Sequence, residues 1–198
     1  MYPRTHRRSL LGIFSVAAAL GVVVACTKPE PPRTTQVSPV ERGLYLVNVV
    51  GCGDCHTPKL FTANGPEPDK TRLLSGHPAD AKLPSVPPGI IGPDQWGALA
   101  NNELTAWAGP WGVSYTANLT PDATGLGSWT PEIFIQAMRT GKHAGTGRDI
   151  LPPMPWMDFA LMTDEDLRAV FAYLKSLPPI SNVVPAPVPP APDSAPGE

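Results

Sequence analysis

The chain has 198 residues, with 15 Lys and Arg against 17 Asp and Glu, which gives a formal net charge of −2 at pH 7. This length is sufficient for one domain with a hydrophobic core, and the absence of a basic run argues against nucleic acid as a partner. Charged residues make up only 16% of the chain, whereas it contains 27 Pro and 18 Gly. Long loops are therefore expected between the regular elements.

Residues 1–25 have the pattern of an export signal. Arg4, Arg7 and Arg8 form a positively charged start, and an apolar stretch runs from Leu10 to Val24. Because this stretch is too short to span a bilayer comfortably, we predict a cleaved signal peptide rather than a transmembrane helix. Its removal would make the formal charge more negative, since three arginines and no acidic residue are lost.

The end of this segment, Val23-Val24-Ala25-Cys26, is similar to the lipobox of bacterial lipoproteins. The alternative is an ordinary signal followed by an incidental cysteine, but the small Ala25 directly before Cys26 favours lipidation. Buried lipid chains contribute about 0.8 kcal/mol per methylene group, so they would anchor the protein at a membrane surface. Thr27, in place of aspartate, favours the outer membrane if the bacterium is Gram-negative.

Two Pro-rich stretches bracket the predicted domain. Residues 26–38 are expected to form an extended tether, and residues 185–198 a disordered tail. The folded domain is therefore assigned to residues 39–184, and we expect it to be mainly helical with long loops.

The first predicted helix leads into the most informative motif of the chain. Ser38 can cap this helix, with Pro39 at its first position. The helix runs through Gly51 into Cys52-Gly53-Asp54-Cys55-His56, which is the C-x-x-C-H attachment signature of a c-type haem.

The chemistry of haem attachment explains this spacing. The thiols of Cys52 and Cys55 can add to the two vinyl groups of one porphyrin edge, and His56 then lies under the iron as its proximal ligand. Pro58 and the prolines beyond it are candidates for the carbonyl that orients the other ring nitrogen. A zinc site needs about four ligands, and a thioredoxin-like site needs a βαβ setting; the sequence predicts neither.

A long segment, residues 57–116, follows the haem motif, and we call it the insert. It is Pro-rich and apolar and contains Trp96, Trp107 and Trp111, so we expect it to cover part of the haem edge. A short helix is predicted around residues 94–106. No convincing set of alternating strands is present.

Two further helices are predicted from their caps. Thr130 begins one, which ends at Gly141. Thr163 begins the other, which has acidic residues in its first turn and ends before Pro178. The loop between these helices contains the methionine discussed next.

The second axial ligand determines the class of function. Met154 lies in the stiff sequence Leu151-Pro152-Pro153-Met154-Pro155-Trp156 and is the favoured distal ligand. Met157, a histidine (His77 or His143), or an open site are the alternatives. A His/Met pair suits electron transfer, whereas an open site suits a haem-based sensor or a peroxidase-like enzyme.

These residues together resemble a class I cytochrome c. More narrowly, Gly43–Asn48, Asn118–Thr130 and Met154–Pro178 resemble the monohaem modules in cytochrome subunits of bacterial membrane dehydrogenases. The match covers about residues 40–179. The insert is far longer than the shortest connections in that family.

The resemblance implies a helical fold around one covalent haem c, with His56 and Met154 as iron ligands. It implies that Gly43 allows two helices to cross closely, and that Asn118 and Trp129 hydrogen-bond haem propionates or loop carbonyls. It also implies an electron carrier, rather than an enzyme, on the periplasmic side of a membrane. Its partners would be redox proteins: a dehydrogenase, an oxidase or another cytochrome.

Overall fold

The structure is a computed structural model that describes residues 37–190. The predicted signal peptide, the predicted lipidation site Cys26 and most of the predicted tether lie outside these residues. None of the helices in the described range is long and apolar enough to cross a membrane.

The first predicted helix is confirmed. Helix α1 spans Pro39–Val49, and Ser38 forms a capping box with Glu41. The Glu41 N–H donates to Ser38 Oγ at 3.2 Å, and the Ser38 N–H donates to Glu41 Oε2 at 3.0 Å. Gly51 adopts a left-handed conformation with φ of 72°, which turns the chain sharply into α2, Cys52–His56.

The two later helices are also confirmed. Helix α3 spans Pro131–Thr140 with Thr130 as its N-cap, and α5 spans Asp164–Ser176 with Thr163 as its N-cap. A short helix that was not predicted, α4 (Trp156–Phe159), follows the methionine loop. Two 3-10 turns complete the helical elements, η1 (Lys70–Arg72) and η2 (His143–Gly145).

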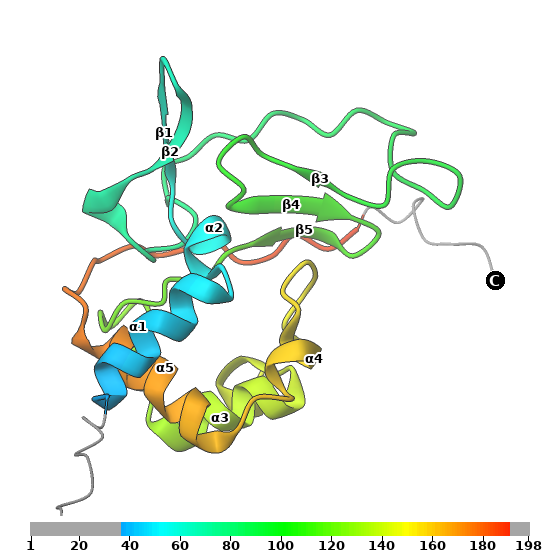
Figure 1. The fold of residues 1–198 in the computed structure, drawn as a ribbon. Helices are drawn as coiled ribbons and strands as arrows, with labels where there is room; N and C mark the ends of the chain where they lie inside the picture. The colour runs from blue at the N-terminus through cyan, green and yellow to red at the C-terminus, as the bar shows by residue number, and fades with distance from the viewer. Residues whose placement is uncertain (1–36, 191–198) are drawn as a thin grey trace, which may run out of the picture. The chain divides into compact units, whose positions relative to one another are not determined.

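Helices α1 and α5 cross in close contact, as Figure 1 shows, and Gly43 lies where they meet. A Cβ atom on Gly43 would collide with the carbonyl oxygen of Ala169 and lie 2.7 Å from Tyr173 Cβ. Arg42 and Asp166 join the same two helices by an ion pair of 2.9 Å. The prediction that Gly43 permits a close crossing is therefore confirmed.

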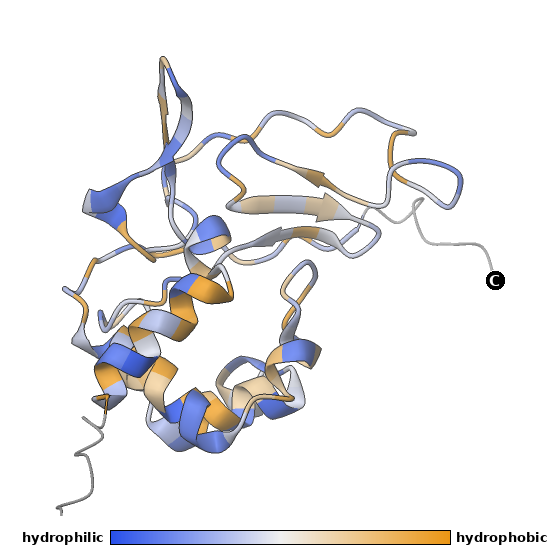
Figure 2. Cartoon of the chain, in the orientation of Figure 1, coloured by the Kyte–Doolittle hydropathy of each residue, from blue (hydrophilic) through white to orange (hydrophobic). Residues whose placement is uncertain are grey.

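We call the three helices α1, α3 and α5 the helical scaffold. A hydrophobic core lies between them. Figure 2 shows apolar and polar positions alternating along these helices. The rings of Phe134 and Phe171 meet at 5.4 Å between α3 and α5. Most buried members of this core come from the three helices, and Leu74 of the insert and Leu126 of the loop before α3 complete it: Leu46, Val47, Leu74, Leu126, Phe134, Ala137, Met138, Leu167, Ala169, Val170, Phe171 and Leu174.

The insert differs from its prediction because it contains two small antiparallel sheets. Strands β1 (Lys59–Thr62) and β2 (Gly65–Pro68) form one hairpin. Strands β3 (Leu99–Ala100), β4 (Ala106–Gly109) and β5 (Gly112–Tyr115) form the other sheet in that order. The described residues therefore have mixed helical and strand content, not the mainly helical content predicted. Strands of two to four residues are too short to show a recognisable alternation.

The helix predicted around residues 94–106 is wrong. The chain there forms β3 and then a turn in which Leu104 has φ of 59°. The Asn101 side chain accepts hydrogen bonds from the N–H groups of Thr105 and Ala106 at 2.8 and 2.9 Å. A local side-chain-to-backbone turn therefore competes successfully with helix formation.

The predicted disordered tail also needs correction over residues 185–190. Val188 exchanges two backbone hydrogen bonds with Val113 of β5, at 2.7 and 2.9 Å. An exposed strand edge provides unpaired backbone groups, so even a Pro-rich segment can pair there at a non-proline residue.

Candidate haem-binding site

The haem-motif helix α2 brings both thiols to the edge of an apolar space. Cys52 and Cys55 are free and partly buried. Burial raises the pKa of the Cys52 thiol to about 11, and burial also raises the pKa of Cys55. Burial therefore favours the neutral thiol form of both side chains.

His56 is buried and its ring is oriented by the backbone. Its Nδ1 lies 2.8 Å from the carbonyl oxygen of Ala117, so Nδ1 carries the proton and donates it. Burial lowers the pKa of His56, which favours the neutral ring. The lone pair is then on Nε2, the atom free to bind a metal. The carbonyl of Pro58, suggested from the sequence for this role, instead accepts from the Asp69 N–H at 2.8 Å.

Lys59 stabilises the carboxyl end of the haem motif and was not identified from the sequence. Its Nζ donates to the carbonyl oxygens of Gly53, Asp54 and Thr57 at 3.2, 2.8 and 2.7 Å. A cation at this end of α2 bonds the carbonyls of Asp54 and Thr57, and it shares the Gly53 carbonyl with the Thr57 N–H, which donates to it at 3.2 Å. Burial lowers the pKa of Lys59, in keeping with its packed position against the motif. The sequence offered one indication of this role, because Lys59 follows His56 by only three residues.

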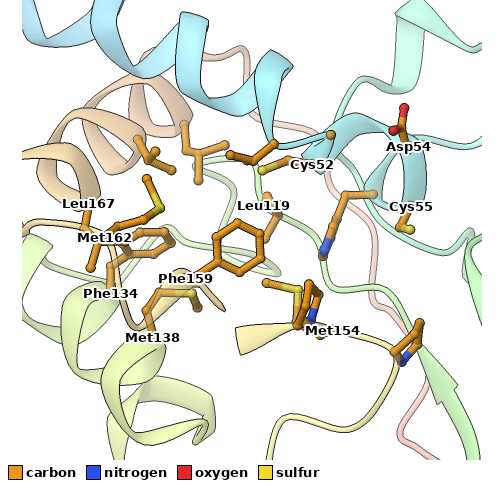
Figure 3. A pocket seen from close by; sticks show the side chains of 17 residues that line it. Cys52, Asp54, Cys55, Leu119, Phe134, Met138, Met154, Phe159, Met162 and Leu167 are labelled. Atoms are coloured by element: carbon orange, nitrogen blue, oxygen red, sulfur yellow. The ribbon is translucent and has the colours of Figure 1, made fainter. Parts of the chain in front are cut away.

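Two cavities of about 250 and 480 Å³ flank the space between His56 and Met154. Figure 3 shows Met154, Met138 and Phe159 converging beneath Cys52. The first cavity extends toward Cys52 and α5, and the second toward Trp129 and Ile150. Six residues line both of them: His56, Leu119, Phe134, Met138, Pro153 and Met154.

The structure separates the candidates for the distal ligand. Met154 lies in a loop and lines both cavities with His56, whereas the Met157 side chain is 62% exposed. His77 is completely buried, and its Nδ1 lies 2.9 Å from Thr105 Oγ1. His143 borders only the second cavity, where its ring meets Trp129 edge-on at 5.3 Å.

Asn118 and Trp129 both border the second cavity, but their polar groups differ. The Asn118 amide is engaged within the protein: Nδ2 donates to Thr124 Oγ1 and to Ile180 O at 3.0 and 2.8 Å. Its Oδ1 accepts from the Thr120 N–H at 2.9 Å. Within residues 37–190, the Trp129 indole N–H makes no hydrogen bond. Arg148, which sequence reasoning missed, borders the same cavity from the exposed side.

The residues present fit a covalently bound haem. Two neutral thiols, the Nε2 of an oriented His56 and the thioether of Met154 surround cavities with mainly apolar walls. Thioether and imidazole are both established axial ligands of c-type haem. Trp129 and Arg148 provide donors at the other border, where acidic substituents of the porphyrin would require them.

The fold and this donor set define a c-type cytochrome. The chain belongs to the cytochrome c family, whose model matches residues 40–178. Electron transfer by a c-type haem is the function shared by this family and supported for this domain.

The curated relatives connect the domain with dehydrogenases. The chain is 29% identical to a nicotinate dehydrogenase subunit of Pseudomonas putida over 90% of its own length and 12% of that protein. It is 26% identical to the cytochrome c subunit of a quinone alcohol dehydrogenase of Gluconobacter oxydans, over 81% of this chain and 26% of the relative.

A third relative is the fructose dehydrogenase cytochrome subunit of Gluconobacter japonicus, 30% identical over 75% of this chain and 23% of that protein. The chain thus spans about a quarter or less of these relatives. Its likeness is to a cytochrome module within dehydrogenase subunits, as the sequence resemblance indicated.

Proposed function

We propose that this domain is a one-electron carrier on the outer face of a bacterial membrane, holding one haem c with His56 and Met154 as axial ligands. The observation that carries this proposal is that His56 and Met154 line the same two cavities from different elements. When bound, the haem supplies the redox chemistry, because its iron accepts one electron as Fe(III) and releases it as Fe(II).

The residues of the chain have three tasks in this proposal. Ala117 fixes the tautomer and orientation of His56 through the Nδ1 hydrogen bond. Apolar side chains such as Leu119 and Phe134 exclude water from the space between the ligands. Trp129 and Arg148 are the donors we assign to the haem propionates, since the Asn118 amide is engaged within the protein.

A dehydrogenase is the partner that we propose as electron donor. Three relatives are named as subunits of dehydrogenases, two of them as cytochrome subunits. The negative formal charge favours a basic docking face on the partner, and salt would then weaken the association. Purification in mild detergent at low salt tests this: a co-purifying dehydrogenase supports a complex, and recovery of the domain alone supports a free carrier.

Absorption spectroscopy of the haem-loaded protein tests the axial ligands. Methionine ligation gives the oxidised protein a weak far-red charge-transfer band, and this band is expected to disappear in Met154→Ala. Met138→Leu is the matched control, because Met138 lines the same two cavities but belongs to the buried core of α3. A high-spin spectrum with rapid carbon monoxide binding in the unmodified protein would instead identify a sensor or a peroxidase-like enzyme.

We propose that a lipid on Cys26 anchors the domain at the outer face of the membrane. A substitution at this cysteine tests the anchor. Cys26→Ser should move the haem-loaded protein from the membrane fraction to the soluble periplasmic fraction. Retention of this variant in the membrane fraction would contradict the anchor. The spectrum should be the same in both proteins, because Cys26 lies outside the predicted domain of residues 39–184.

A further inference from the structure

The loop that carries Met154, residues 151–155, makes few hydrogen bonds to the rest of the protein. Within it, the Met154 N–H donates to Leu151 O at 3.3 Å, and its three prolines have no N–H to donate. Ser114 Oγ donates to Pro152 O at 2.6 Å. In the described part of the chain, this is the one hydrogen bond that connects residues 151–155 to an element other than the adjoining α4.

The environment of Ser114 directs its hydroxyl proton to this loop. The side chain is only 7% exposed, and the Trp111 indole N–H donates to its oxygen at 3.2 Å. Trp107 O is a second acceptor for the hydroxyl, but at 3.4 Å it is the more distant one. A hydroxyl has one proton to donate, and accepting a hydrogen bond polarises it, so Pro152 O receives a strengthened bond.

The same stretch of chain also reaches the other side of the site. Ala117, three residues after Ser114, provides the carbonyl that accepts from His56 Nδ1 at 2.8 Å. Strand β5 is itself held on both edges, by β4 and by Val188. The Thr116 N–H adds a further backbone bond to Thr105 O at 2.9 Å.

We propose that residues 114–117, the end of the insert and the residue directly after it, position both axial ligands, with Ser114 acting as the positioning residue for the Met154 loop. This proposal rests on the proposed function, because it takes Met154 as the distal ligand. This role is in addition to the covering of the haem edge that the sequence predicts for the insert. Ser114 in β5 and Ala117, two residues after this strand, hold the Met154 loop and His56 in fixed relative positions, so that the iron environment changes little between oxidation states.

The test is the rate at which carbon monoxide displaces methionine from the reduced haem-loaded protein. Removing one hydrogen bond of ordinary strength in Ser114→Ala should accelerate displacement about two- to tenfold. The reduction potential should fall, because the thioether favours Fe(II). Ser114→Thr, which keeps the hydroxyl, should restore most of the slow rate, and Trp111→Phe should have a smaller effect than Ser114→Ala.

Ser176→Ala is the matched control. Ser176 Oγ also donates to a backbone carbonyl, that of Tyr173 at 2.7 Å, but at an exposed position of α5. This variant should leave the displacement rate unchanged. If Ser114→Ala behaves like Ser176→Ala, the positioning role is refuted. If Ser114→Ala does not accumulate with haem, Trp111→Phe decides: an unchanged rate refutes the role, and an increase supports it.

The outcomes also separate this proposal from the one on which it rests. If the charge-transfer band is absent from the unmodified protein, or survives in Met154→Ala, the assignment of Met154 has failed. If the band depends on Met154 but neither Ser114→Ala nor Trp111→Phe changes the displacement rate, only the positioning role has failed.

Discussion

The helical scaffold and the insert contribute to the site in different ways. The scaffold of α1, α3 and α5 provides apolar walls through side chains such as Phe134, Leu167 and Leu174, which line the first cavity. The insert contributes few of these walls. It provides polar contacts instead: the Ser114 hydroxyl bonds the methionine loop, and Ala117, the residue directly after the insert, supplies the carbonyl for His56.

This difference indicates a division of roles between enclosing and orienting. Burial of apolar surface is non-directional, so helices can enclose a large flat group without precise polar contacts. Hydrogen bonds are directional, so a short, well-paired strand is better suited to fix a ring or a loop. Damage to the scaffold should therefore lower stability most, whereas damage to the insert should change ligation more than stability.

The largest effect on stability is expected for Gly43→Ala in the scaffold. Its new Cβ would collide with backbone atoms of Ala169, which cannot move aside as a flexible side chain can. We expect a loss of about 3 kcal/mol in the free energy of unfolding, at the upper end of the range for overpacking. Chemical denaturation of the haem-loaded protein measures this loss.

Gly97→Ala in the insert is the control for that experiment, because a Cβ at Gly97 meets no atom within 4 Å. Its free energy of unfolding should match that of the unmodified protein. Equal losses in the two variants would show that the α1–α5 crossing has no special role in the stability of the domain.

A moderate effect is expected for Lys59→Met at the start of the insert. The variant keeps most of the apolar stem but removes the ammonium that bonds two carbonyls of the haem motif and that of Thr57 directly after it. We expect a loss of about 1–2 kcal/mol in the free energy of unfolding. The charge-transfer band should remain, because Lys59 contacts neither His56 nor Met154.

Lys82→Met is the matched control, since Lys82 is an exposed lysine of the same insert. Denaturation curves of the two variants measured side by side separate the specific contact from the loss of one positive charge. A loss of equal size in both variants would argue against the role of Lys59 in capping α2.

The scaffold was far more predictable from the sequence than the insert. Its helix caps at Ser38, Thr130 and Thr163 are encoded by residue type and spacing, and the structure has all three. The apolar periodicity extends over ten or more residues in each of these helices, which is enough to define a face.

The orienting contacts were not predictable for a physical reason. The acceptors for His56, Lys59 and Ser114 are backbone carbonyls, which every residue type possesses. A sequence therefore shows that His56 needs a carbonyl but not that Ala117, 61 residues away, supplies it. That carbonyl follows β5, which is held by its pairing with β4 and by backbone bonds of Thr116, and strands of four residues leave no clear pattern.

The smallest effect on stability is expected when the Asp69 carboxylate of the insert is protonated at acid pH or removed by substitution. Hydrogen bonds from Thr71, and then from Arg72, lower the pKa of Asp69 to about 2 from an ordinary value of 3.8. A carboxylate whose pKa is lower in the folded state stabilises the fold above its unfolded pKa. This contribution is lost as the pH falls from about 4 to about 2.

Thermal unfolding of the haem-loaded protein between about pH 5 and 2 measures how much the Asp69 carboxylate contributes to stability, and a carboxylate on the scaffold serves for comparison. Asp69→Asn should lower the free energy of unfolding near neutral pH by up to about 1 kcal/mol; the effect is limited because its partner Arg72 is partly exposed. The variant should also show a smaller loss of stability at acid pH.

Glu132→Gln is the scaffold counterpart: Glu132 pairs with Arg168 at 2.7 Å, but both side chains are exposed. Salt should screen this exposed pair readily and the buried Asp69 carboxylate much less. If both variants respond equally to acid and to salt, polar contacts of the insert are no more specific than those on the scaffold surface, and the division between an enclosing and an orienting region is wrong.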